Sequence, residues 1–355
     1  MPIPKNYWKN LIKIWGKQRL LDPLVFVYHV TAKCNLDCAY CEDYGARLNS
    51  QAQASLSLDD AVRALRAARS GADHLIITGG EPLLYPEIDA LVRRAKQELK
   101  FRHITLLTNG VLLSQHEALL PYLDKLVVSL DGVDKERWTR ILGSPVKTAH
   151  TILDNIAAYA ARQQEYGYTM AVNCVLTPDL LADIDRLFDF CRQNQILVSF
   201  SPQSVNNWPK YELVTSEAYQ AFMERLARRK KEEALVLGSR KYLRVMQALT
   251  PYACYPTLAP RMLPNGDLIY PCRPIQKEAN GFGGQPCNML EVKSWKQAAA
   301  LAEQAYGQPP SMCTSCFQQC YIEPSLMQAH PAAYLRETFF DAASRKGALA
   351  SHAPG

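Results

Sequence analysis

The sequence predicts an α/β fold: a partial (β/α)6 TIM-like barrel followed by a small C-terminal cysteine-rich domain. Two observations predict it. Between about residues 24 and 202, short β-branched runs alternate with longer segments of helical period, which is typical of βα units around a parallel sheet. From about Cys254 onward, the chain changes to short segments punctuated by cysteines. Six βα units fall short of the eight of a closed barrel, so we expect an open one.

The strand candidates are short apolar runs in regular succession. They are Leu24–Val30, His74–Thr78, His103–Thr108, Leu126–Ser129, Met170–Leu176 and Ile196–Ser201. Between them, apolar residues at three- and four-residue spacing predict amphipathic crossover helices. These helices are Leu58–Ala68, Glu87–Leu99, Val146–Ala161 and Leu180–Cys191. In such a barrel the functional site lies at the carboxyl ends of the strands.

By composition the chain divides into four parts. Residues 1–23 hold an N-terminal amphipathic helix, 24–235 the barrel, 236–345 the cysteine-rich region and 346–355 a disordered tail. A basic helical stretch, Arg225–Glu233, leads into the cysteine-rich region. Within that region, the sequence Pro-Asn-Gly-Asp at 264–267 lies between two apolar runs and predicts a hairpin turn, because Asn-Gly suits the backbone of such turns.

Composition narrows the classes of function. The net charge of +6 is spread over many segments of the 355-residue chain, so we expect no nucleic-acid partner. No apolar stretch approaches the roughly 18 residues of a membrane span, and no signal peptide is recognisable, so we expect a cytoplasmic protein. Eleven cysteines in such a chain indicate metal binding rather than a disulfide framework.

The first cysteine group is Cys34, Cys38 and Cys41, with the spacing C-x3-C-x2-C directly after the first predicted strand. Three thiolates on a compact loop can bind three irons of a [4Fe-4S] cubane and leave the fourth iron open for another ligand. Zinc is the alternative, but structural zinc takes four protein ligands, and the nearest further candidate, His29, lies back in the strand. We favour the cluster.

This loop resembles the radical SAM superfamily, whose open iron binds S-adenosylmethionine (SAM). In that family the aromatic residue before the third cysteine, here Tyr40, packs near the adenine. The segment 79–82 resembles the GGEP motif, whose backbone and glutamate receive the amino group of SAM, and the end of the fourth strand supplies ribose contacts. Taken singly, each motif is also compatible with an ordinary turn. The residues expected to bind SAM are Tyr40, Gly79, Gly80, Glu81, Pro82, Asn109, Ser129 and Asp131.

The second cysteine group resembles the SPASM/twitch extension of radical SAM enzymes, in which a hairpin and a later cysteine pair bind an auxiliary [4Fe-4S] cluster. The spacing is similar to that of 2-deoxy-scyllo-inosamine dehydrogenase and, more weakly, to that of adenosylhopene synthase-type enzymes. One auxiliary cluster is therefore expected, and a zinc ribbon is the alternative. The favoured ligands are Cys254, Cys272, Cys313 and Cys316, with Cys320 as the rival and Cys287 unassigned.

Between Tyr7 and Leu21, lysines 9, 13 and 17 repeat at four-residue spacing, and the apolar residues 8, 11, 12 and 15 gather on the other side of a helical wheel. Such a helix binds peripherally to an anionic membrane or covers the flank of the barrel with its apolar face. Both alternatives stay open here.

The resemblance implies that a flavodoxin or ferredoxin reduces the first cluster and that SAM is cleaved to a 5′-deoxyadenosyl radical. The radical then abstracts hydrogen from, or adds to, a small-molecule or lipid-precursor substrate, and the auxiliary cluster assists substrate binding or electron transfer. One alternative is a maturase of a ribosomal peptide, although the roughly 23 residues before the first strand leave no room for a winged-helix peptide-binding domain. A second is a non-enzymatic zinc or Fe–S interaction protein. Arg273 is a candidate for an anionic substrate group, and no general base is identified.

Overall fold

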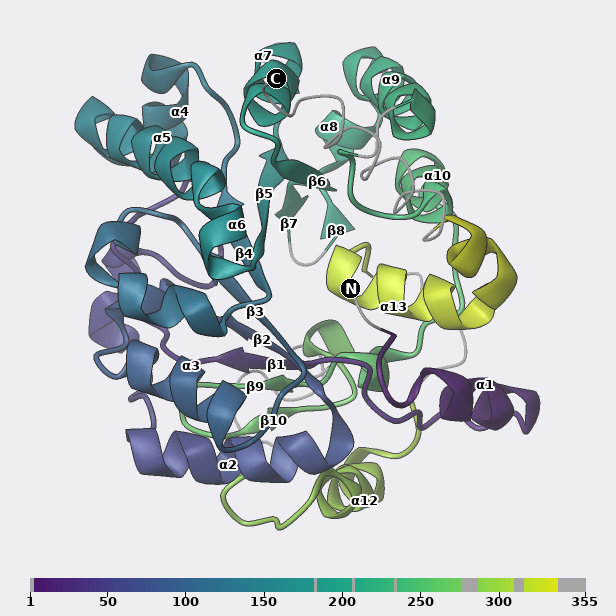
Figure 1. The fold of residues 1–355 in the computed structure, drawn as a ribbon. Helices are drawn as coiled ribbons and strands as arrows, with labels where there is room; N and C mark the ends of the chain where they lie inside the picture. The colour runs from purple at the N-terminus through teal and green to yellow at the C-terminus, as the bar shows by residue number, and fades with distance from the viewer. Residues whose placement is uncertain are drawn as a thin grey trace.

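The computed structural model describes residues 3–181, 184–205, 208–232, 235–275, 287–309 and 316–337. Its centre is an eight-stranded sheet in the order β10-β9-β1-β2-β3-β4-β5-β6, in which β1 to β6 run parallel (Figure 1). The α/β partial barrel predicted from the sequence is confirmed. The barrel strands are β1 Phe26–His29, β2 His74–Thr78, β3 His103–Thr108, β4 Lys125–Ser129, β5 Thr169–Leu176 and β6 Leu197–Pro202.

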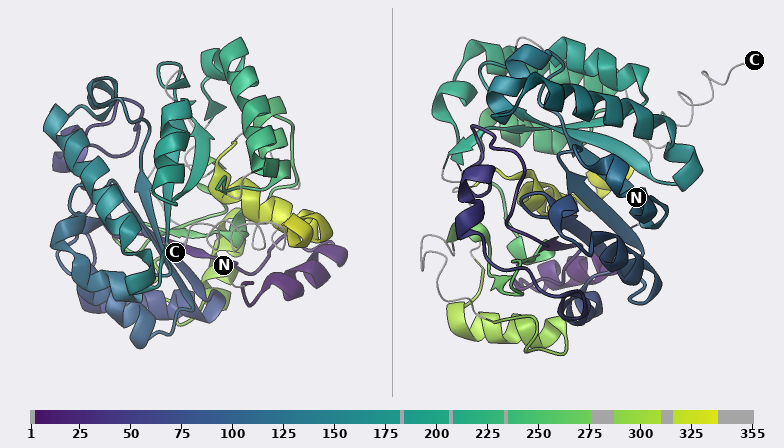
Figure 2. Two further views of the ribbon diagram at one scale, coloured as in Figure 1. Left: turned by 45° about the horizontal axis from the view of Figure 1, so that its top comes forward. Right: turned by 90° about the vertical axis from the view of Figure 1, so that its left-hand side faces the viewer.

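Amphipathic helices cover the outer face of the curved sheet (Figure 2). They are α2 Leu58–Gly71, α3 Ile88–Gln97, α4 Lys135–Leu142, α5 Val146–Ala161, α6 Gln163–Tyr166 and α7 Ile184–Gln193. The 3-10 turns are η1 Ala46–Gln51, η2 Pro82–Leu84, η3 Leu113–Gln115, η4 Glu117–Tyr122 and η6 Pro256–Leu258. The sequence analysis missed α4. This helix is short, and its clearest signal is Asp134, whose side chain caps it by accepting a hydrogen bond from the N–H of Arg137 at 3.0 Å.

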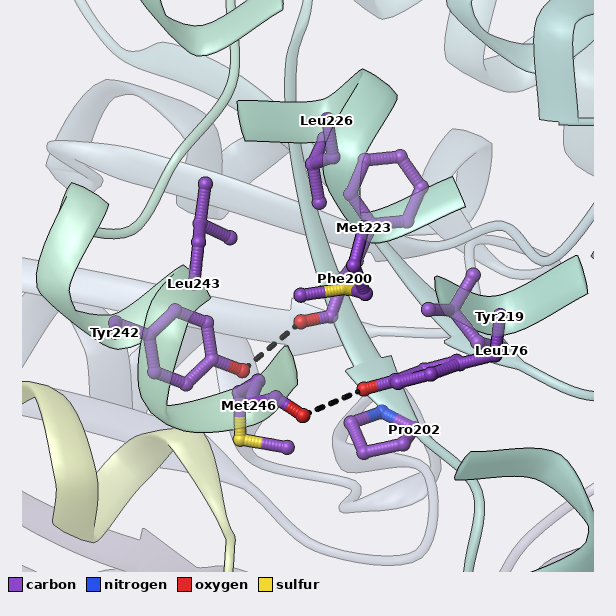
Figure 3. Close-up of a pocket in the computed structure, with 9 residues that line it drawn as sticks. All are labelled: Leu176, Phe200, Pro202, Tyr219, Met223, Leu226, Tyr242, Leu243 and Met246. Atoms are coloured by element: carbon purple, nitrogen blue, oxygen red, sulfur yellow. Dashed lines mark hydrogen bonds between the residues drawn. The ribbon is translucent and has the colours of Figure 1, made fainter. Parts of the chain in front are cut away.

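After β6 come a two-stranded ribbon, β7 Ser204–Val205 with β8 Trp208–Pro209, and the helices α8 Tyr211–Val214, α9 Glu217–Glu232 and α10 Arg240–Ala248. The helices α9 and α10 pack over β6 (Figure 3). The hydroxyl of Tyr242 donates to the carbonyl of Phe200 at 3.0 Å, and that of Tyr219 donates to the carbonyl of Met246 at 3.0 Å. The space they enclose is about 10 Å³, room for roughly one water molecule, so it is core packing and not a ligand site.

The predicted hairpin turn is confirmed. Strands β9 Arg261–Met262 and β10 Leu268–Ile269 pair antiparallel, and Gly266 between them has φ +91°. Because β9 also pairs parallel with β1, the hairpin extends the barrel sheet rather than forming a sheet of its own. The helices α12 Trp295–Tyr306 and α13 Gln319–Ala329 follow, and α12 packs on α2. The division into domains made from the sequence stays a prediction.

The N-terminal helix α1 spans Tyr7–Trp15 and packs against α13. It is shorter than the segment to Leu21 expected from the sequence, because Gly16 caps it and Lys17 adopts φ +57°. Its predicted apolar face is divided: Leu11 packs against the protein, whereas Trp8, Ile12 and Trp15 are exposed. Within the described residues, no helix combines the length and hydropathy needed to cross a bilayer.

Candidate active site

The first three cysteines lie on the loop between β1 and η1, and contacts from distant elements hold this loop. The Asn49 side chain accepts from the N–H of Cys34 at 2.9 Å and donates to its carbonyl at 2.8 Å. At the end of α4, the carbonyls of Ile141 and Leu142 accept hydrogen bonds from backbone N–H groups of the loop at 2.8 and 3.2 Å. The loop is therefore positioned before any ligand binds.

The thiols of Cys34, Cys38 and Cys41 are free and half-buried. Burial raises the pKa of Cys34 to about 11 and that of Cys38 to about 12, so both are protonated at neutral pH in the metal-free protein. Three sulfur donors on one short loop suit an iron–sulfur cluster, whose binding must displace these protons. Among the residues that the structure describes, no three His, Cys, Asp or Glu side chains gather closely enough to hold a single metal ion.

The Gly-Gly-Glu-Pro segment after β2 pairs with the start of the cysteine loop. The N–H of Gly80 donates to the carbonyl of Thr31 at 2.8 Å, and the N–H of Glu81 donates to that of Lys33 at 2.8 Å. A Cβ on Gly79 would lie 2.4 Å from the Thr31 oxygen, and one on Gly80 would lie 2.2 Å from the Lys33 oxygen. The absence of a side chain at these two glycines therefore lets the backbone of the cysteine loop approach them closely.

Glu81 is completely buried, and its carboxylate faces the end of β3. It accepts hydrogen bonds from the hydroxyl of Thr108 and the N–H of Asn109, both at 2.7 Å, and from the N–H of Leu83 at 2.9 Å. Burial raises its pKa to about 7. Hydrogen bonds to this carboxylate thus connect the segment after β2 to the end of β3. The contact of Glu81 with the SAM amino group stays a prediction. Pro82, the next residue, is buried at the start of η2.

Two side-chain pairs connect the cysteine loop to the next strand ends. The Asn109 amide donates to the Asn35 side-chain oxygen at 2.7 Å, and the Tyr40 hydroxyl donates to the Asp131 carboxylate at 2.7 Å. The other Asp131 oxygen accepts from the N–H of Val175 on β5 at 2.8 Å, and burial raises the pKa of Asp131 to about 6. The sequence analysis expected Tyr40 and Asp131 as separate SAM contacts. In the structure their side chains are hydrogen-bonded to each other.

A row of polar side chains crosses three neighbouring strands at the same level. Ser129 on β4 is in register with Asn173 on β5, which is in register with Ser199 on β6. The hydroxyl of Ser199 donates to the Asn173 side-chain oxygen at 2.9 Å, and Ser129 is exposed. The sequence analysis named only Ser129. Strand register reveals the other two, because alternate residues of a strand share a face.

Two residues back along the same strands, the side chains on that face are apolar. Val127, Ala171 and Leu197 form a small buried cluster there. The interior of the barrel thus changes from an apolar floor to a polar rim at the end that carries the cysteine loop.

A cavity of about 280 Å³ lies between the cysteine loop and the β9–β10 hairpin. Arg273, expected from the sequence as a candidate anion contact, lines the cavity and forms an ion pair with Asp43. His29 also lines it; its Nδ1 is 2.8 Å from the Tyr44 hydroxyl, and its buried Nε2 has no partner among the described residues. Burial lowers the pKa of His29 to about 3, so the ring is neutral at pH 7 and can donate or accept one further hydrogen bond.

Of the second cysteine group, Cys254, Cys272 and Cys316 are buried in the main core, and Cys320 is partly exposed. Cys313 lies outside the described residues. Cys287 is also buried, and its thiol lies 3.9 Å from the carbonyl of Ala298 on α12, at the distance of a weak S–H hydrogen bond.

Arg261 on β9 brings a positive charge to this second group, and the sequence analysis missed it. The buried guanidinium contacts the Cys320 sulfur and interacts electrostatically with Cys316. It also stacks over the Tyr321 ring at 4.7 Å. A cation at this position complements the negative charge that thiolates carry when they bind iron or zinc.

Residues 28–191 match the family model of the Radical SAM superfamily. The matched segment is a little under half of the chain and runs from β1 through β5 into α7, so in fold and in this segment the chain is similar to radical SAM enzymes. Over 174 residues it is 25% identical to a probable GTP 3′,8-cyclase from Methanococcus aeolicus, covering 48% of this chain and 56% of the relative. The chain spans about half the length of the curated relatives it matches.

Two solved structures extend the likeness beyond the barrel. Streptococcus suis SuiB bound to its precursor peptide SuiA superposes with a TM-score of 0.61 and 20% identity, covering 84% of this chain and 69% of SuiB. The enzyme anSMEcpe with bound AdoMet and the Kp18Cys peptide superposes with a TM-score of 0.56 and 12% identity, covering 89% of this chain and 99% of anSMEcpe. At these identities the likeness shows the fold.

Proposed function

We propose that this enzyme binds a [4Fe-4S] cluster through Cys34, Cys38 and Cys41 and modifies a peptide substrate by radical chemistry. The observation that carries the proposal is the set of three free thiols on one loop. Hydrogen bonds connect this loop to the ends of several barrel strands. When bound and reduced, the cluster would supply the electron for cleavage of SAM into methionine and a 5′-deoxyadenosyl radical, and that radical would abstract a hydrogen atom from the substrate.

The chain's own residues orient SAM. The N–H groups of Gly80 and Glu81 are engaged by the loop, so the polar rim of the barrel offers the side chains for the ribose, with the exposed Ser129 hydroxyl as the first candidate. Asp131 holds Tyr40 in place through its hydroxyl, which leaves the Tyr40 ring face for the adenine. In this arrangement the residues bind and position SAM, and exclude water from the radical.

The proposed substrate site is the cavity beside the cysteine loop. At about 280 Å³ it lies at the lower limit of small-ligand pockets, and it suits one side chain of an extended peptide. His29 offers a hydrogen bond to that side chain, and the Arg273–Asp43 pair offers groups of both charges.

Exposed apolar side chains on the β6 side of the barrel support a peptide substrate. Val205 and Trp208 on the β7–β8 ribbon and Tyr211 next to it are exposed. The Trp208 ring packs edge-on against Phe317, beside Cys316, with 5.2 Å between the ring centroids. A short ribbon with apolar side chains is a surface along which an extended peptide can lie.

The extent of the likenesses also favours a peptide. The structures bound to peptides, SuiB and anSMEcpe, cover 84% and 89% of this chain, including the cysteine-rich region. The GTP 3′,8-cyclases match only about half of it. The likeness in fold to the peptide-bound structures thus extends into the C-terminal region, whereas the likeness to the cyclases covers about half of the chain.

For the auxiliary site we propose one [4Fe-4S] cluster of the SPASM/twitch type. Its ligands are Cys254, Cys272 and Cys316, together with either Cys313 or Cys320. Arg261 would partly neutralise the negative charge of this cluster. The cluster would assist substrate binding or accept an electron from the substrate.

A small-molecule or lipid-precursor substrate is the second candidate. The exposed Trp8, Ile12 and Trp15 of α1 favour it, because a protein that acts on lipid precursors benefits from an apolar surface of this kind. The two candidates share the chemistry of SAM cleavage and differ in what enters the cavity.

The first experiment is anaerobic reconstitution with iron and sulfide, then addition of dithionite and SAM, with chromatography of 5′-deoxyadenosine and methionine. The wild-type protein should form both products, and Cys34→Ala, Cys38→Ala and Cys41→Ala should form neither. Cys191→Ala, at a buried cysteine on α7, is the matched control and should stay active. A cysteine-loop variant that keeps the wild-type rate would show the ligand assignment to be wrong.

Metal analysis and isotope transfer test the remaining alternatives. About eight irons per chain indicate two [4Fe-4S] clusters, whereas zinc with little iron indicates the interaction protein instead. Deuterated peptides and deuterated lipid precursors are then compared for deuterium transfer into 5′-deoxyadenosine. Transfer from a peptide supports the main proposal, and transfer from a lipid precursor supports the second candidate.

A further inference from the structure

The outward face of α1 carries a stripe of large apolar side chains. Trp8, Ile12 and Trp15 are 55%, 69% and 84% exposed, and their spacing of four and three residues places them along one side of the helix. The helix lies at the edge of the molecule (Figure 2). Two tryptophans and an isoleucine in one row are more than the scattered apolar side chains of an ordinary surface, and such rows mark interaction sites.

The opposite face of α1 is held firmly against the protein, so the stripe is directed outward. The Asn10 amide donates to the Asp22 carbonyl at 2.8 Å, and its oxygen accepts from the Asp22 N–H at 2.9 Å. Tyr7 and Asn10 are buried, and Leu11 and Ile14 pack against the core around Leu258. Rotating the helix to hide the stripe would break these contacts.

The segment around the stripe is strongly basic. Residues 3–21 contain four lysines and one arginine and no acidic residue. Lys9 and Lys13 pair with Asp22, whereas Lys17 is exposed and its side-chain ammonium group forms no hydrogen bond or ion pair among the described residues. This surface combines positive charge with aromatic side chains, the two features that bind proteins to anionic bilayers.

We propose that the stripe Trp8–Ile12–Trp15 docks this enzyme on the surface of an anionic lipid bilayer. The charge of the segment favours a bilayer over a second copy of the chain. A second copy would bring two basic segments together, whereas an anionic bilayer would neutralise the positive charge of the segment. The tryptophan rings enter the interface between headgroups and acyl chains, and Lys17 remains at the headgroups. This docking is independent of the proposed SAM chemistry.

The test is sedimentation of the reconstituted full chain with vesicles of phosphatidylcholine, with and without phosphatidylglycerol. We expect binding to the anionic vesicles at low salt, a blue shift of tryptophan emission, and weak binding to phosphatidylcholine alone. The triple variant Trp8→Ser, Ile12→Ser, Trp15→Ser should bind at least about tenfold more weakly, and Lys17→Glu a few-fold more weakly. Matched controls are Leu301→Ser and Lys296→Glu on α12, which alter an exposed apolar residue and an exposed lysine elsewhere.

Three results would overturn the proposal. They are no binding of the wild type to phosphatidylglycerol vesicles at low salt, equal binding by the triple variant, and a wild-type dimer in sedimentation velocity that the triple variant abolishes. The last would make the stripe an interface between copies. SAM cleavage should be unchanged in the triple variant, and thermal unfolding should change little, because Ile12 and Trp15 face solvent. Trp8 also packs edge-on against the Tyr7 ring, so the double variant Ile12→Ser, Trp15→Ser, which keeps this contact, is measured beside it.

Discussion

Arg273, the residue after Cys272, forms an ion pair with Asp43, which lies two residues after Cys41. Both side chains are largely buried, at 13% and 23% exposure. The backbone N–H of Arg273 also donates to the Tyr321 hydroxyl at 3.4 Å. A single residue thus connects the cysteine loop of the barrel to the second cysteine region and forms one wall of the proposed substrate cavity.

This pair predicts an energetic coupling between the two cysteine regions. Arg273→Met leaves the Asp43 carboxylate largely buried without its partner, so we expect the free energy of unfolding to fall by about 1–3 kcal/mol. Urea unfolding of the metal-free protein measures this free energy. A double-mutant cycle with Asp43→Asn isolates the interaction energy of the two side chains. Arg192→Met, at an exposed ion pair with Asp189, is the control and should cost less than about 1 kcal/mol. A coupling near zero would contradict the prediction.

Glu81 predicts a pH dependence of stability. Its pKa is about 7 in the folded protein and 4.5 ordinarily, so between these values the folded state binds a proton that the unfolded state has released. The contribution of Glu81 is therefore fully present below about pH 4.5 and is lost as the pH rises through 7. Relative to Glu81→Gln, the wild type should lose about 3 kcal/mol over this window.

Denaturant unfolding of metal-free wild type and Glu81→Gln at several pH values measures this difference. The variant should be less stable overall, because its amide group would face backbone and hydroxyl donors. Glu98→Gln, the same substitution at a surface ion pair with Arg94, is measured as the control. If Glu81→Gln runs parallel to the wild type from pH 4.5 to 7, the buried titration of Glu81 does not occur.

Gly80 predicts that adding one methyl group displaces the cysteine loop. In Gly80→Ala the new Cβ would lie 2.2 Å from the backbone oxygen of Lys33, so one of the two segments must move. We expect a loss of about 2–4 kcal/mol in the free energy of unfolding and reduced iron uptake on reconstitution. Gly16→Ala is the control, because its Cβ would meet nothing closer than 3.5 Å. Iron content equal to that of the wild type would argue against a positioning role for Gly80.

Cysteine substitutions should separate ligands from packing cysteines in the second region. Cys316→Ala should lose about four of about eight irons, because it removes a ligand of the auxiliary cluster. Cys287→Ala should keep about eight, because the Cys287 thiol is directed to the carbonyl of Ala298 on α12. Iron analysis and electron paramagnetic resonance after reconstitution measure both. A loss of iron in Cys287→Ala equal to that in Cys316→Ala would make Cys287 a ligand.

Much of the barrel was predictable from the sequence because parallel strands are continuous apolar runs and their crossover helices are strongly periodic. The strands His74–Thr78 and His103–Thr108 have the predicted limits. Short elements were not predictable. The ribbon β7–β8 has two residues in each strand, and α4 has eight residues, so neither contains enough periods of its pattern to stand out.

The sequence by itself determined the chemistry available to the protein: three thiols on one loop, a Gly-Gly-Glu-Pro turn, a second cysteine group and the Asn-Gly hairpin. These signals are local, since residue type and spacing within a few residues decide them. The tertiary structure alone decided that Glu81 faces Asn109, that Tyr40 is bonded to Asp131, that Arg273 meets Asp43, and that α1 directs its tryptophans to solvent. Strand register and helix packing bring these groups together across long stretches of chain, and no local pattern encodes such distances.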